Sequence, residues 1–229
     1  MGLWSKIQAI IEITHRRTLG AALDALAEQR VKRDEAAFSI ALIALSAKMA
    51  KADGVVTDDE IEAFKDFFQF DEQDARKVRM VYDLAQQDVA GFDQYLSRVA
   101  RIFENEPVVL EDVLDCLFHI AAADGVAHPR ELELLEQAAT ALHVSPAAFR
   151  RIKAVHLGLG EDDPYTILGV DPEIDDSALK AAYRQLVKEH HPDAMIARGV
   201  PAALVKIAEG RIAAINSAYE QAITERKQG

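Results

Sequence analysis

The stretch that decides the fold of the C-terminal part reads Tyr183-Arg184-Gln185-Leu186-Val187-Lys188-Glu189-His190-His191-Pro192-Asp193. Its apolar positions, continued one turn further toward the N-terminus, have the spacing of one face of an α-helix. The residues on this face are Leu179, Tyr183, Leu186 and His190. The pattern predicts an amphipathic helix that packs through this face and presents its other side to solvent or to a partner.

Both ends of this helix can be predicted from the flanking residues. Asp175 or Asp176 is a suitable N-cap, because a short carboxylate accepts hydrogen bonds from the first free amides of a helix. Pro192 disfavours helical geometry at the residue before it, so the helix should end at or just before His191. We therefore expect the side chains of His191, Pro192 and Asp193 on an exposed, locally stiff loop.

A row of basic residues lies beside the packing face of the same helix. Lys180, Arg184 and Lys188 follow one another at intervals of four, so they share one stripe. A row of exposed cations suits an acidic surface on a partner protein. The row and the His191-Pro192-Asp193 tripeptide are therefore candidate binding residues. The simpler alternative is that His191 caps a helix and Asp193 begins a loop, with no partner.

Sequence on both sides of this helix resembles a known family. Ahead of it lies Asp163-Pro164-Tyr165-Thr166-Ile167-Leu168-Gly169-Val170, and after it come Ile212, Ile215, Asn216, Ala218 and Tyr219 at helical spacing. Residues 163–229 thus resemble a J domain, the module through which DnaJ-type co-chaperones drive the ATPase of DnaK-class chaperones.

This resemblance implies a helical hairpin, a DnaK-class chaperone as partner, no catalytic residue and no required cofactor. It also implies that His191, Pro192 and Asp193 bind the chaperone together with the basic row. Gln185 and Ala194 stand at positions that are often basic in the family, which points to a weaker or more selective interaction.

Residues 34–155 show helical spacing and no alternating strand pattern, so we expect the whole chain to be all-α. This region contains an internal repeat. Ala50-Lys51-Ala52-Asp53-Gly54-Val55-Val56-Thr57-Asp58-Asp59-Glu60 aligns with Ala121-Ala122-Ala123-Asp124-Gly125-Val126-Ala127-His128-Pro129-Arg130-Glu131. Each copy predicts a helix, a glycine turn and a second helix.

The acidic residues of the repeat have two interpretations. Glu60 and Glu131 fit the first turn of a helix, where free amides and the macrodipole favour a carboxylate. Asp53 and Asp124 end an incoming helix, where the macrodipole opposes a negative charge. If the copies pack around a pseudo-twofold axis, the four carboxylates meet at a divalent cation, which prefers oxygen ligands. Helix capping and turn chemistry are the alternative.

This repeat resembles a TerB-like domain, the helical fold of tellurite-resistance proteins, in which such paired acidic motifs are suspected of binding metal. A TerB-like domain followed by a J domain resembles the DjlA family of membrane-anchored co-chaperones. Ala197-Arg198-Gly199-Val200-Pro201, after the tripeptide, fits the same likeness. The expected organisation is an amphipathic helical segment at 1–30, a TerB-like helical bundle at 31–156, a linker at 157–162 and the J domain at 163–229.

Composition narrows the functions that the chain can have. The formal net charge is −12, of which residues 31–162 carry −11, and this argues against nucleic acid as a ligand because phosphate backbones need clustered Lys and Arg. Cys116 is the single cysteine, which excludes a disulfide within the chain and a cysteine-ligated zinc finger. Its apolar neighbours predict a buried thiol.

Targeting signals are weak. No apolar run approaches the roughly eighteen residues of a spanning helix, and no secretory signal is recognisable, so the cytoplasm is the expected compartment. Residues 3–14 predict a short amphipathic helix. We expect it to dock on the acidic domain or on a second copy of the chain, as in a homodimer. Peripheral attachment to a membrane surface is the alternative.

Two other classes of function compete with that of a co-chaperone. An enzyme would need a third group and a substrate pocket beside His191 and Asp193, and no other motif supplies them. The second alternative is a metal-responsive scaffold, in which the TerB-like domain binds a cation or an unknown partner and the J domain is secondary.

Overall fold

The computed structural model describes residues 23–24, 35–53, 80, 82–85, 87, 91–122, 129–158, 163–197 and 205–228. Every regular element within these ranges is an α-helix, which confirms the predicted all-α class. The amphipathic helix expected at residues 3–14 lies outside them.

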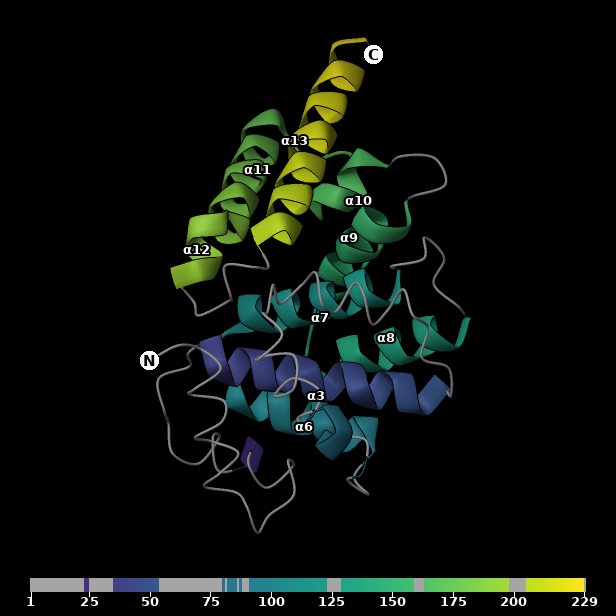
Figure 1. Ribbon diagram of the computed structural model, residues 1–229. Helices are drawn as coiled ribbons and strands as arrows, with labels where there is room; N and C mark the ends of the chain where they lie inside the picture. The colour runs from purple at the N-terminus through teal and green to yellow at the C-terminus, as the bar shows by residue number, and fades with distance from the viewer. Residues whose placement is uncertain are drawn as a thin grey trace.

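The first domain is built around one nearly all-buried helix. It consists of α3 (Glu35–Asp53), α6 (Phe92–Ile102), α7 (Pro107–Ala121), α8 (Pro129–Ala141) and α9 (Pro146–Leu157). Helix α7 lies between α3 on one side and α9 on the other (Figure 1). A helix with apolar side chains on nearly all sides must be surrounded by other helices, and α7 meets this condition. Cys116, in this helix, is fully buried as predicted.

Helix α9 forms the side of the first domain that meets the rest of the chain. Its start is fixed by Ser145, whose hydroxyl accepts a hydrogen bond of 3.1 Å from the amide of Ala148, and by Pro146 at the first helical position. Its last residue, Leu157, is followed by Gly158 with φ of +72°, a conformation that favours glycine. The helix carries Arg151 toward the second domain, where Nη2 lies 3.4 Å from His190 Nε2, and it carries His156 onto Asp115 of α7.

The second domain is a helical hairpin with two short additions. It consists of α10 (Pro164–Leu168), α11 (Asp176–His190), α12 (Pro192–Ala197) and α13 (Val205–Gln228). Helices α11 and α13 run antiparallel side by side, and α10 packs across α13 (Figure 1). The predicted face of α11 does pack: Leu179, Leu186 and His190 are buried. Tyr183 is half-buried, and its ring stacks on Tyr219 with centroids 4.1 Å apart.

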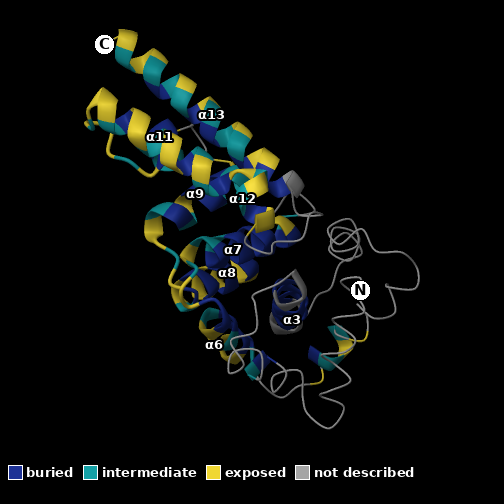
Figure 2. Cartoon of the chain, turned by 90° about the vertical axis from the view of Figure 1, so that its left-hand side faces the viewer, coloured by how far each residue is buried: buried dark blue, intermediate teal, exposed yellow. Residues whose placement is uncertain are grey.

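The core of the first domain extends into the second. Met195 of α12 and Ile207 and Ala208 of α13 belong to the same hydrophobic cluster as α3, α7 and α8, whereas the hairpin has a separate cluster of its own. Figure 2 shows buried residues filling the region where α7, α9 and α13 approach one another. The two domains are therefore docked through a packed interface.

Candidate chaperone-binding site

The start of α11 is fixed by a side-chain cap. Asp175 is the N-cap, and its Oδ1 accepts hydrogen bonds of 2.9 Å from the amides of both Ser177 and Ala178. Hydrogen bonds from the Ser177 hydroxyl and from these amides lower the pKa of Asp175. Asp176 instead pairs with Arg226 of α13 at 2.8 Å. Of the two candidates that the sequence offered, Asp175 is thus the cap.

The end of α11 agrees with the prediction, but the loop after it does not. Helix α11 stops at His190, and His191 is extended, with φ of −63° and ψ of 137°. Pro192 and Asp193, however, already form the first turn of α12, so the expectation of a three-residue loop was wrong. The physical reason is that proline suits the first helical position, where its missing N–H is not needed and its φ is already helical. One residue, His191, separates the two helices.

His191 caps α12 with both its backbone and its side chain. Its carbonyl accepts hydrogen bonds from the amides of Ala194 and Met195 at 2.9 and 3.1 Å. Its ring Nδ1 accepts one of 3.2 Å from the amide of Asp193, which requires Nδ1 without a proton. In the neutral ring, Nε2 is then the hydrogen donor. The imidazole is held by its own helix start while its side chain is 52% exposed.

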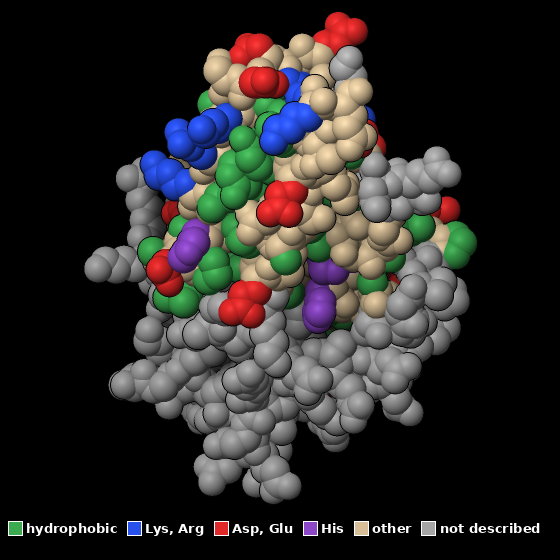
Figure 3. Space-filling model, turned by 90° about the horizontal axis from the view of Figure 1, so that it is seen from above, with side chains coloured by type: hydrophobic (Ala, Val, Ile, Leu, Met, Phe, Trp, Pro, Cys, Tyr) green, Lys and Arg blue, Asp and Glu red, His purple; other side chains and the backbone are tan. Residues whose placement is uncertain are grey.

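The basic row is exposed along α11, as expected. Lys180, Arg184 and Lys188 are all exposed. Figure 3 shows Lys and Arg side chains gathered over the second domain, with a histidine and an acidic side chain close by. The side chain of Asp193 is 89% exposed. The structure therefore presents both parts of the predicted binding site to solvent.

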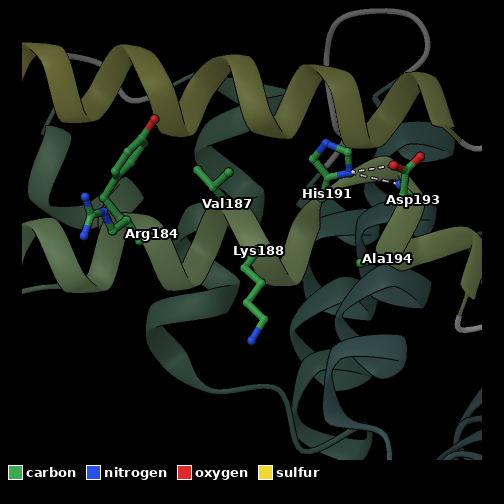
Figure 4. Close-up of a pocket in the computed structure, with 7 residues that line it drawn as sticks. Arg184, Val187, Lys188, His191, Asp193 and Ala194 are labelled. Atoms are coloured by element: carbon green, nitrogen blue, oxygen red, sulfur yellow. Dashed lines mark hydrogen bonds and ion pairs between the residues drawn. The ribbon is translucent and has the colours of Figure 1, made fainter.

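An open groove of about 400 Å³ brings much of this site together (Figure 4). It is lined by Tyr183, Arg184, Val187, Lys188, His191, Asp193 and Ala194. Lys180 and Pro192, two of the predicted residues, do not line it. The sequence reasoning missed the apolar floor that Val187 supplies. The signal was present, because Val187 lies one turn beyond Tyr183 on the same side of the helix.

The candidate metal site lies partly outside the residues that the structure describes. Asp53 is the last residue of α3, and Glu131 is buried in the first turn of α8. Glu60 and Asp124 lie outside the described residues. Within the part of the chain that the structure describes, no group of three or more His, Cys, Asp or Glu side chains is arranged to hold a metal ion. Metal binding by these four carboxylates stays a prediction.

Comparison with known proteins agrees with the order of the two domains. The family model for tellurite resistance protein TerB matches residues 39–154, and the model for the DnaJ domain matches residues 163–228. Co-chaperone protein DjlA of Photobacterium profundum is 28% identical over 218 residues, which cover 84% of this chain and 79% of the relative. The protein of the same name from Escherichia coli is 30% identical over 130 residues, which cover 47% of this chain and 48% of the relative. No solved structure matches the chain.

The chain therefore belongs to the TerB family, and the DnaJ domain that follows makes it a DnaJ-type co-chaperone of the DjlA-like kind. The resemblances inferred from the residues are confirmed. Among the helices that the structure describes, none has the length and apolar character needed to cross a bilayer.

Proposed function

We propose that this chain stimulates the ATPase of a DnaK-class chaperone through the groove between α11 and α12. The observation that carries the proposal is the joint exposure of His191 and Asp193 beside the basic row. In this mechanism the basic row of Lys180, Arg184 and Lys188 attracts an acidic surface of the chaperone. The exposed corner, formed by His191, Pro192 and Asp193, then engages the chaperone. Binding favours the hydrolysis-competent state of the chaperone because the corner has higher affinity for that state.

Charge and shape have separate tasks in this mechanism. Exposed cations act over about 8 Å at physiological ionic strength, so they raise the rate of encounter and lose strength in salt. The imidazole and the carboxylate of the corner are held in a fixed relation by the cap on α12, since the amide of Asp193 is bonded to His191 Nδ1. The corner therefore supplies specificity at short range.

A steady-state ATPase assay with a DnaK-class chaperone tests the proposal. We expect His191→Gln to abolish stimulation while circular dichroism shows an unchanged helical fold. We expect Lys180→Gln/Arg184→Gln/Lys188→Gln to raise the half-saturating concentration by about tenfold at low salt and by less at high salt. Lys227→Gln, an exposed lysine near the end of α13, is the control for charge loss. Full stimulation by the His191→Gln chain would refute the proposed function.

A further inference from the structure

Buried residues lie close to the exposed corner on both sides: His190 directly before it, and Met195 two residues after Asp193. His190 and Met195 are each 1% exposed, whereas His191 and Asp193 between them are open to solvent. Neither flanking residue belongs to the separate core of the hairpin. Met195 belongs to the core of the first domain, and His190 faces a buried ionic cluster at the domain interface.

Arg211 of α13 is the centre of this cluster. Its guanidinium is 1% exposed and faces two aspartates of α7 that are fully buried. Nε donates to Asp115 Oδ2 at 2.7 Å, with a second bond from Nη2 to the same oxygen, and Nη1 donates to Asp112 Oδ1 at 3.0 Å. These contacts join residues almost a hundred positions apart, one from each domain. Burial alone disfavours the positive charge of Arg211 and the negative charges of the two aspartates. Each domain therefore depends on the other to offset its buried charge.

The same guanidinium reaches the end of α11. Arg211 Nη1 lies 2.6 Å from His190 Nδ1, so this ring nitrogen accepts and Nε2 carries the proton of the neutral ring. Nε2 lies 3.8 Å from Glu111 Oε2 of α7 and 3.4 Å from Nη2 of Arg151 in α9. Arg151 in turn donates to Glu111 at 2.8 Å. The last residue of α11 is thus enclosed by side chains from α7, α9 and α13.

We infer that the first domain is a positioning platform for the chaperone-binding corner, with Arg211 as the positioning residue that joins the two. The inference rests on the proposed function and adds a regulator to it: the docked TerB domain sets the direction of His191 and Asp193. Loss of Arg211 removes the positive charge that Asp112 and Asp115 share, and the interface opens to hydrate the two buried carboxylates. His190 and Met195 are then released, and the corner loses its fixed direction although every groove residue is still present.

Two measurements on the full chain test this inference. Spin labels at Glu136→Cys in α8 and Glu220→Cys in α13, both exposed, report the distance between the domains; buried Cys116 stays unlabelled. ATPase stimulation gives a maximal value and a half-saturating concentration. For Arg211→Met we expect a broad distance distribution in place of a narrow one. We expect maximal stimulation to fall by about tenfold because the corner is misoriented. The half-saturating concentration should stay within about twofold of the wild-type value.

A second variant separates docking from the chemistry of Arg211 itself. Asp112→Met/Asp115→Asn/Arg211→Met removes all three charges, and a neutral interface of similar volume can close again. The asparagine still accepts the hydrogen bond that His156 Nε2 gives to Asp115 Oδ1. We expect the narrow distance distribution and the stimulation to return together.

Two control variants exclude a general loss of stability. Arg226→Met removes an arginine that bonds to Asp176, Tyr165 and the Pro172 carbonyl, all within the second domain. Leu135→Ala opens the core of the first domain on α8, a helix that contributes no residue to the ionic cluster around Arg211. Both are expected to keep the narrow distance and the full stimulation.

The outcomes are distinguishable. An Arg211→Met chain that stays docked and does not stimulate, or one that is undocked and stimulates fully, overturns the positioning role. A wild-type chain that stimulates no DnaK-class chaperone overturns the proposed function instead, whatever the distance measurement shows.

Discussion

Acid should weaken the domain interface through one carboxyl group, that of Asp115. Burial alone raises the pKa of this group, but the charge of Arg211 and the hydrogen bond from His156 outweigh burial and lower the pKa to about 2 from 3.8. The unfolded chain therefore binds a proton at higher pH than the folded chain does. A lowered pKa means that this stabilisation is fully present above about pH 4 and is lost as the pH falls toward 2.

The size of the effect follows from the two pKa values. Lowering a pKa from 3.8 to about 2 corresponds to roughly 2 kcal/mol of folding free energy at pH 7. At pH 3 the same two values leave about 1 kcal/mol of this stabilisation. Other carboxyl groups titrate in this range as well, among them Glu111, whose pKa is raised by burial against the opposing charges of Arg151 and Arg211. The difference between wild type and Asp115→Asn isolates the contribution of Asp115.

Urea unfolding at pH 7, 5, 4 and 3, followed by circular dichroism, measures this difference. We expect the free energy of unfolding of Asp115→Asn to be roughly 2 kcal/mol below that of wild type at pH 7, and this difference to shrink by about half at pH 3. Asp193→Asn is the matched control, because this carboxylate is exposed and its loss should change the free energy of unfolding little. A difference in free energy of unfolding between wild type and Asp115→Asn that is constant from pH 7 to pH 3 would refute the assignment of a buried, ionised carboxylate.

Three further predictions concern two helix ends and the acidic repeat. Ser145→Ala removes the cap of α9 and should lower the free energy of unfolding by about 1 kcal/mol, measured by thermal or urea unfolding. Gly169 has φ of +67° at the end of α10, so Gly169→Ala should cost about 1 kcal/mol in the same assay through backbone strain. If the acidic repeat holds a divalent cation, calorimetry with calcium, magnesium, manganese or zinc should give heat for wild type and none for Asp53→Ala/Asp124→Ala; silence in every titration of wild type removes the metal hypothesis.

Local patterns in the sequence were enough to predict helix α11 and both of its ends, whereas the hairpin was implied by the resemblance to a J domain. The packed face of α11, its Asp175 cap and its end before His191 each depend on residues within a few positions of one another. The exposure of the basic row follows from the same helical period. The extent of α12 was missed because proline was interpreted only as the residue that ends a helix, whereas Pro192 also begins the next one.

The domain interface could not be predicted, because its partners are far apart in the sequence. Asp112 and Asp115 stand in a largely apolar run, and this run was interpreted through Cys116 alone. Two carboxylates inside a buried helix need a counter-charge, so they were a usable signal. Which of the 26 Lys and Arg residues supplies that charge is decided by tertiary packing, and nothing near Arg211 in the sequence indicates it.

The connection between α11 and α12 has an additional consequence for how this site tolerates change. With one residue between the helices, a single pair of torsion angles at His191 sets the direction of the second helix. No further residue in this connection can absorb a change in the angle between the helices. An alanine inserted there would keep every side chain of the site, yet in helical geometry it would swing Asp193 by about 100°. The number of residues in the connection between α11 and α12 is therefore as important to the recognition site as their identity.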